Sequence, residues 1–293
     1  MPRLGIGDLA KPPKRLRPSR VLLKENTDRP FEAKEEVVQE AHMRAKLLRQ
    51  SADKHPETID PEAALGLAKR LSSRPRMGPH CLCDPRLMRR IRNRVGGWLW
   101  HLVDKYGGPV CTVTLVPRGW AFTPDELQCV DPNKLLNRLR TDLLRCAPNS
   151  GKGWAIYFLH GEFQTAQGAY PMHVHGVAGG AMVKAVDALR KRKNYASTRK
   201  KGQDNTQRVV QSQKPLTNLP EPLTYLLKSY WPKKWKGYVS GVDTERRSRD
   251  HGRIPEPYHS QYLLWLDQLE LKDITLLMGV RVGKKEFILT GQK

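Results

Sequence analysis

The sequence lacks any long apolar run, and this excludes an integral membrane protein. No stretch approaches the roughly 18 to 20 apolar residues that are needed to cross a bilayer, and the mean hydropathy is −0.62. The N-terminal segment MPRLGIGDLAKPPKRLRPSR is basic but has no apolar core of about 7 to 15 residues, so it does not resemble a secretory signal. We therefore expect a soluble cytoplasmic protein.

Cysteines and acidic residues are also scarce. The 293 residues include five cysteines, an odd number, and 39% apolar residues, so a core can form without a disulfide framework. Asp and Glu number 29 against 52 Lys and Arg, which gives a formal net charge of +23. This excess favours a polyanionic partner, and either RNA or DNA satisfies it.

Shifts in composition predict four parts of the chain. A helical period follows a segment rich in Pro, Lys and Arg, and Gly107-Gly108-Pro109 interrupts the chain after it. We expect a flexible basic arm (1–30), a helical N-terminal module (31–106), a main domain (107–240) and a C-terminal appendage of a helix and a hairpin (241–293). Within the module, helices are expected at 30–50, 61–71 and 85–106, with a kink at Gly96-Gly97.

The main domain alternates between strand and helix patterns. Strands are expected at 110–117, 153–164, 170–178 and 207–213, and helices at 133–146, 181–192 and 223–231. The order predicts an α+β fold, with a central antiparallel sheet of split βαβ type and helices on one face. In the appendage, LKDITLLMGV fits either a packing element, which we favour, or the first half of a helix-turn-helix.

Two histidines on a predicted strand are the first candidate functional residues. His173 and His175 are separated by one residue, and residues i and i+2 of a strand project from the same face. Two adjacent imidazoles provide half of a metal site. The pair alone fits a solvated polar sheet face equally well.

The preceding strand of the same hairpin supplies a carboxylate. Glu162 lies on the face that the hairpin brings beside the histidines, and two imidazoles with one carboxylate suit Mg²⁺, Mn²⁺ or Zn²⁺. The alternative for Glu162 is a surface residue at a strand end. His160 and Gln164 are less favoured candidates for a metal ligand or for a residue that supports the ligands. For His160 we favour an ordinary histidine at the sheet edge.

A tyrosine and a lysine follow on a predicted helix. Tyr225 and Lys228 are three residues apart, so they share one helix face. A tyrosine attacks phosphorus when a metal polarises the phosphoryl oxygens and a cation stabilises the developing charge. The alternative is that Tyr225 packs in the core beside Leu226 and Leu227.

The order of these motifs resembles that of the HUH endonucleases, specifically the single-tyrosine initiators of rolling-circle plasmid replication. The resemblance spans about residues 110–231 and rests on strand TVTL, Glu162, His173-x-His175 and Tyr225-x-x-Lys228. It implies a Mg or Mn ion on the two histidines and Glu162. It also implies that Tyr225 nicks single-stranded DNA, leaving a 5′-phosphotyrosine and a free 3′-hydroxyl, and that Lys228 orients the phosphate. The resemblance further implies that the protein acts in a bacterial cytoplasm and that a host helicase is a further partner.

Several alternatives stay open. HUH transposases keep the same order of histidines and tyrosine, whereas relaxases usually have the tyrosine first, which argues against them. A non-catalytic nucleic-acid-binding protein would carry the histidines incidentally. A cupin-like enzyme needs an acidic ligand soon after the pair, but GVAGGAMVKA follows His175. We expect Tyr230, five residues after Tyr225, to pack or contact DNA rather than to act as a second nucleophile.

Two basic segments are candidate DNA contacts, because lysine and arginine bind phosphates and interleaved aromatics stack on bases. Their cations are Lys184, Arg190, Lys191, Arg192, Lys193, Arg199, Lys200 and Lys201 in the first segment, and Lys233, Lys234 and Lys236 in the second. Solvated basic faces are the alternative for both. The sequence His80-Cys81-Leu82-Cys83 has the residue types of a zinc site, but no second pair follows, so we expect none there.

Overall fold

The computed structural model describes the chain in several stretches. They are residues 34–73, 81–146, 153–197, 208–212, 216, 223, 226–227, 233–234, 236–238, 245–247, 252–283 and 286–290. The basic arm predicted at 1–30 lies outside them. Among the described helices, none is both long enough and apolar enough to cross a membrane.

The three helices predicted in the N-terminal module are confirmed. They are α2 (Lys34–Lys54), α3 (Pro61–Ser72) and α4 (Pro85–Tyr106). Asp60 and Asp84 cap the last two by accepting backbone N–H bonds, and a proline follows each cap at the first helical position. The third helix, α4, continues through Gly96-Gly97 without interruption.

The main sheet is antiparallel and gives the protein its α+β class. Its strands are β1 (Val110–Leu115), β3 (Gly153–Gly161), β5 (Tyr170–Gly180), β6 (Val209–Gln211) and β10 (Thr275–Met278). They lie in the order β10-β3-β5-β1-β6, and the short β2 (Ala121–Phe122) pairs with the start of β5. The predicted hairpin is therefore confirmed as β3 and β5, which form the middle of the sheet.

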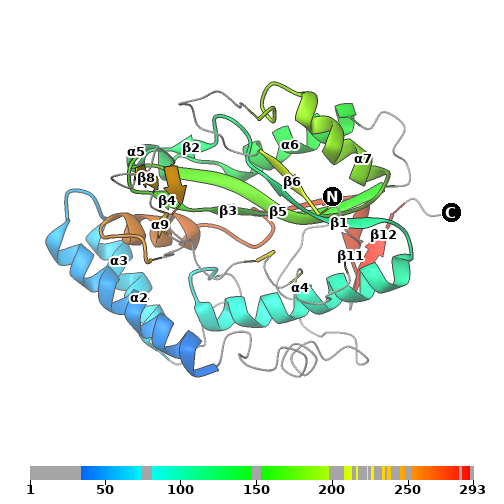
Figure 1. Cartoon of the computed structure of the whole chain (residues 1–293). Helices are drawn as coiled ribbons and strands as arrows, with labels where there is room; N and C mark the ends of the chain where they lie inside the picture. The colour runs from blue at the N-terminus through cyan, green and yellow to red at the C-terminus, as the bar shows by residue number, and fades with distance from the viewer. Residues whose placement is uncertain are drawn as a thin grey trace.

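Helices lie on both sides of this sheet, but from different parts of the chain. The helices α6 (Pro132–Cys146) and α7 (Ala181–Ala188) cover one face, and α4 runs along the other side (Figure 1). A short α5 (Pro124–Leu127) precedes α6, and the 3₁₀ turn η1 (Leu189–Lys191) follows α7. The ring of Trp154 in β3 meets Tyr106 of α4 edge-on. By alternation, every second residue from Trp154 along β3 faces the α4 side.

The C-terminal region is part of the sheet rather than only attached to it. The helix α9 (Tyr258–Asp267) and the hairpin of β11 (Val280–Val282) with β12 (Phe287–Leu289) agree with the predicted helix and hairpin. Between them, β10 pairs with β3 as an edge strand of the main sheet. The helix-turn-helix interpretation of LKDITLLMGV is therefore wrong, because its Thr and Leu residues form that strand.

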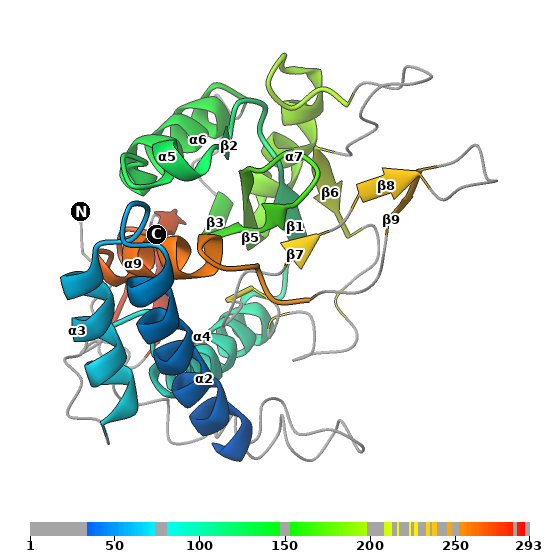
Figure 2. The same cartoon turned by 90° about the vertical axis from the view of Figure 1, so that its left-hand side faces the viewer.

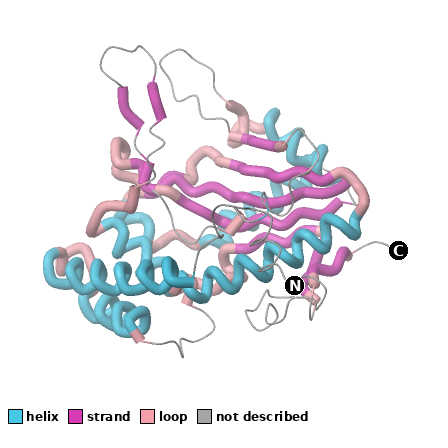
Figure 3. The backbone as a smooth tube through the Cα atoms, turned by 60° about the horizontal axis from the view of Figure 1, so that its bottom comes forward, coloured by secondary structure: helices cyan, strands magenta, loops and turns pink. Residues whose placement is uncertain are grey.

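Short strands connect the site region to the basic segment. The strand β4 (Phe163–Gln164) follows β3 and pairs in parallel with β7 (Lys233–Lys234). Next along the chain, β8 (Lys236–Tyr238) and β9 (Glu245–Arg247) form a ribbon that stands away from the main sheet (Figures 2 and 3).

Candidate functional site

The two histidines of the HxH motif lie together on β5. The Nε2 atoms of His173 and His175 are 3.0 Å apart, and their ring centroids are separated by 4.7 Å. Two nitrogen ligands about 2.1 Å from one ion and at right angles to it are about 3.0 Å apart. The 3.0 Å contact is a hydrogen bond between the two rings, and it also equals the spacing of two adjacent ligands of one octahedral metal ion.

A threonine on the neighbouring strand fixes one of the rings. Thr114 of β1 lies opposite His175, and its Oγ1 is 2.8 Å from the Nδ1 atom of that ring. A histidine that binds a metal through one nitrogen donates a hydrogen bond from the other. In the tautomer in which Nδ1–H donates to Thr114, the Nε2 of His175 is unprotonated, and this atom lies 3.0 Å from the Nε2 of His173.

His160 is a buried member of this group, so its interpretation as an ordinary edge histidine is wrong. It lies directly opposite His173 on β3, between β5 and β10, and is 2% exposed. Its ring centroid is 5.0 Å from that of His175. Its Nε2–H donates to the carbonyl oxygen of Leu226 at 2.5 Å, so the ring is held between the sheet and that segment.

Glu162 is buried beside the histidines, and its interpretation as a surface glutamate is wrong. Its backbone N–H donates to the oxygen of Pro171, which extends the hairpin and keeps it on the His160 face. Its carboxylate accepts a 3.3 Å bond from Gln164, also buried, in the supporting position expected of that residue. The ligand atoms of Glu162, His173 and His175 do not all lie within 4.8 Å of one another. The structure thus brings the imidazoles together and leaves the carboxylate nearby.

The predicted nucleophile and its lysine lie outside the described residues. Neither Tyr225 nor Lys228 is placed, but Leu226, between them in the sequence, is buried and accepts the bond from His160. The segment that contains the motif therefore reaches the histidine face of the sheet at this residue.

The two basic segments have different surroundings. The backbone of Lys233 and Lys234 runs beside β4, which directly follows Glu162. The cations of the first segment that are described, Lys184, Arg190, Lys191, Arg192 and Lys193, lie on or just after α7, across the sheet from the histidines. Most of them are exposed. Arg199, Lys200, Lys201 and Tyr230 lie outside the described residues, and Lys236 begins β8.

Arg190, one of the predicted DNA contacts, is hydrogen-bonded within the chain. Its Nε donates to Asp187 at 2.8 Å, and its Nη1 donates to the carbonyl of Val209 in β6 at 2.6 Å. These bonds hold the end of α7 to the edge strand of the sheet. We assign Arg190 to this structural role.

Two arginines on α4 and Thr114 are functional candidates that sequence reasoning missed. Arg90 is exposed and Arg94 is partly exposed, one turn apart on the helix that lies on the histidine side of the sheet. Burial and the neighbouring charge of Arg90 lower the pKa of the Arg94 guanidinium. Repulsion between like charges at i and i+4 costs stability unless an anion lies between them. The basic first half of the 85–106 helix was the sequence signal for the two arginines. The contact of Thr114 with His175 depends on the register between β1 and β5, which the sequence does not show.

We compared the chain with protein-family models, curated proteins and solved structures, and nothing matches it. The function is therefore inferred from the geometry of the site and from the motifs in the sequence.

Proposed function

We propose that this protein is a metal-dependent endonuclease and strand transferase that nicks single-stranded DNA through a tyrosyl intermediate and initiates rolling-circle replication. The observation that carries the proposal is the 3.0 Å spacing of the His173 and His175 Nε2 atoms. His160 lies against the pair and is bonded to the carbonyl of Leu226. Glu162, two residues after His160, is also buried.

The residues fit a divalent ion such as Mg²⁺ or Mn²⁺. His173 and His175 would hold it through Nε2, with Thr114 fixing one ring, and a rotation of the Glu162 side chain away from Gln164 would add a carboxylate oxygen. When bound, such an ion polarises the phosphoryl oxygens of the scissile phosphate. Open positions around the ion would remain for the DNA.

The chain's own residues would carry out the cleavage. The Tyr225 oxygen, after losing its proton, attacks phosphorus and forms a P–O bond, while the bond to the 3′ oxygen of the preceding nucleotide breaks. That oxygen takes up a proton and leaves as a free 3′-hydroxyl, so no water or nucleotide is consumed. The Lys228 ammonium would stabilise the charge on the phosphate. Attack by a 3′-hydroxyl on the phosphotyrosine is the reverse step and rejoins the strands.

The strand order supports the split βαβ arrangement implied by the resemblance. The HxH strand β5 lies between β3 and β1, and β1 is an interior strand next to it. Helix α6 connects β1 to β3, and α7 leads from β5 to β6, both on the face away from the histidines. This leaves the α4 side of the sheet for DNA, with β7 beside it as a source of cations.

A labelled single-stranded oligonucleotide tests the proposal. The full chain is incubated with DNA that carries candidate origin sequences and with Mn²⁺ or Mg²⁺, and the products are separated on a denaturing gel. We expect a covalent protein–DNA adduct that EDTA prevents, and we expect Tyr225→Phe to abolish it while DNA binding persists. Tyr230→Phe is the matched control and should still form the adduct.

Other outcomes point to the competing functions. An adduct that persists in Tyr225→Phe would refute the nucleophile assignment. DNA binding without cleavage, unaffected by EDTA, would indicate a non-catalytic binding protein. Cleavage confined to the ends of a mobile element, rather than at a replication origin, would identify a transposase that uses the same chemistry.

A further inference from the structure

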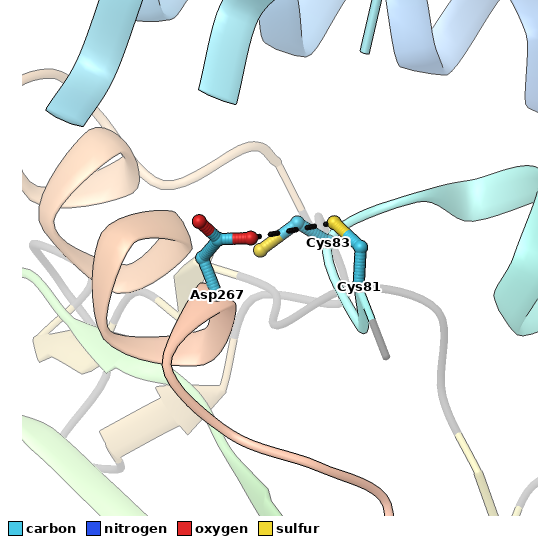
Figure 4. A group of neighbouring side chains, drawn as sticks. All are labelled: Cys81, Cys83 and Asp267. Carbon is cyan, nitrogen blue, oxygen red and sulfur yellow. Dashed lines mark hydrogen bonds between the residues drawn. The ribbon is translucent and has the colours of Figure 1, made fainter. Parts of the chain in front are cut away.

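A second cluster of metal-ligand side chains lies well away in sequence from the HxH strand. Cys81 and Cys83 lie in the turn that precedes α4, and Asp267 is the last residue of α9. One ligand atom from each lies within 4.8 Å of the other two, and the carboxylate of Asp267 points toward the thiols (Figure 4). In the described part of the chain, no other group of three such side chains is this compact.

The distance between one sulfur and the carboxylate fits a tetrahedral zinc site. The Cys81 Sγ and Asp267 Oδ1 atoms are 3.4 Å apart. With Zn–S near 2.3 Å and Zn–O near 2.1 Å, a tetrahedral angle separates sulfur from oxygen by about 3.6 Å. The thiols are buried, at 8% and 0% exposed, so an ion bound here would be shielded from solvent.

The surrounding groups are arranged to hold anionic ligands. The second oxygen of Asp267 pairs with Arg70 of α3, which leaves Oδ1 directed at Cys81. The Arg44 guanidinium is fully buried and donates to the Cys83 carbonyl at 2.9 Å, so its positive charge lies close to that residue. Two thiolates and a carboxylate around a divalent ion have a net charge of −1, which Arg70 beside Asp267 offsets, whereas Arg44 also pairs with Glu40.

We propose that Cys81, Cys83 and Asp267 bind a structural Zn²⁺ ion that fastens the N-terminal helices to α9. Two sulfurs with one carboxylate favour zinc over the Mg²⁺ or Mn²⁺ suited to the histidine site. Binding releases the two thiol protons to solvent, and the 2.9 Å bond that the Cys83 thiol donates to Leu263 is lost with its proton. A water molecule would supply the fourth ligand.

The site differs from the sequence expectation because its third ligand is distant in the chain. No second cysteine pair follows Cys83, and for that reason the sequence argued against zinc. Asp267 replaces the second pair, and 186 residues separate it from Cys81. Its helix also reaches the histidine region, since Tyr258 at its start stacks on Phe163, next to Glu162.

Metal analysis of the purified full chain tests this proposal. After dialysis against a buffer that contains zinc and then against a metal-free buffer, elemental analysis should find about one zinc per chain. Cys83→Ser and Asp267→Asn should each lose most of it, whereas Cys129→Ser, at an exposed cysteine, should retain it. The double variant His173→Ala/His175→Ala should also retain it, which separates this site from the proposed nuclease site. A strong chelator should lower the melting temperature of the wild type more than that of Asp267→Asn.

A spectroscopic measurement covers the case in which a cysteine variant fails to fold. Replacement of zinc by Co²⁺ in the wild type should give thiolate-to-cobalt charge-transfer absorption, which Asp267→Asn should shift or weaken. Wild-type protein that binds neither metal overturns the proposal. So does a zinc content that is unchanged in the Cys83 and Asp267 variants, or a disulfide between Cys81 and Cys83 in place of bound metal.

Discussion

The hydroxyl of Thr114 is the smallest feature on which the proposed metal site depends. Its Oγ1 lies 2.8 Å from the His175 Nδ1 atom, and a hydrogen bond donated by Nδ1–H would leave Nε2 free for a metal. The histidines could be predicted from sequence because their spacing on a strand determines that they share a face. Thr114 could not, since its contact depends on the register between β1 and β5.

Removal of this hydroxyl should weaken metal binding without unfolding the site. We expect Thr114→Val to reduce Mn²⁺ affinity by about 10- to 100-fold, because the His175 ring loses the group that orients it. Nicking measured against Mn²⁺ concentration should show the loss at low metal and recovery at high metal. Thr114→Ser should behave like the wild type, as should Thr112→Val, two residues earlier on β1. A loss that excess Mn²⁺ does not restore would contradict this role.

Among the elements, those with local signals could be predicted from sequence and those with distant partners could not. The helix α3 follows from Asp60, the proline after it and the apolar period, all contained in a short window. By contrast, β10 is a short apolar run whose type is settled by its pairing with β3, far earlier in the chain. The same reason applies to Asp267, whose nearness to Cys81 only the folded chain reveals.

The helix α2 is anchored by a carboxylate with an unusual titration. Burial raises the pKa of Glu40, but hydrogen bonds and charges from Arg253 and Arg44 outweigh it and lower the pKa from 4.5 to about 2. Arg253 donates to both carboxylate oxygens, at 2.9 and 2.5 Å, so it ties α2 to the segment before α9. This contact should make the docking of the helix dependent on pH.

The sign of that dependence follows from the lowered pKa. The contribution of Glu40 to the free energy of unfolding is fully present above about pH 4.5 and is lost as the pH falls toward 2. We expect Glu40→Gln to cost about 2 kcal/mol at neutral pH. Urea unfolding from pH 7 to 3 should show the difference from the wild type shrinking as the pH drops. Glu35→Gln, at an exposed position of the same helix, should change neither the free energy of unfolding at neutral pH nor its dependence on pH. A difference that does not vary with pH would rule out ionisation as its cause.

For the molecule as a whole, the positive charge is distributed on both sides of the sheet. Cations on and after α7 lie on one side, and Arg90 with Arg94 of α4 lies on the side of the histidines. If the proposed function is correct, a single strand held at the histidines would pass near this helix, and the α4 arginines would then be candidate phosphate contacts. The net charge of +23 suggested a polyanion, and the fold places Arg90 and Arg94 on the helix that runs along the histidine side of the sheet.

The salt dependence of DNA binding tests whether the α4 arginines, rather than the cations near α7, contact the DNA. Each phosphate contact on single-stranded DNA contributes about 0.7 to the slope of log K against log salt. We expect Arg90→Ala/Arg94→Ala to lower that slope by about 1.4 and to weaken binding similarly for all sequences. Lys69→Ala, at an exposed position of α3, should leave the slope unchanged. An unaltered slope in the double variant would place the DNA elsewhere.

The position of β10 also bears on how the protein matures during translation. β3 carries His160 and precedes Glu162, and its outer edge is covered by residues 275–278. When both histidines of a nascent chain have left the ribosome, β10 has not yet been synthesised. The outer edge of β3 is then unpaired, and an unpaired edge strand can pair with other chains. The sheet that carries the histidines can therefore be completed only after residues 275–278 have been synthesised, so a shorter nascent chain would lack the assembled site.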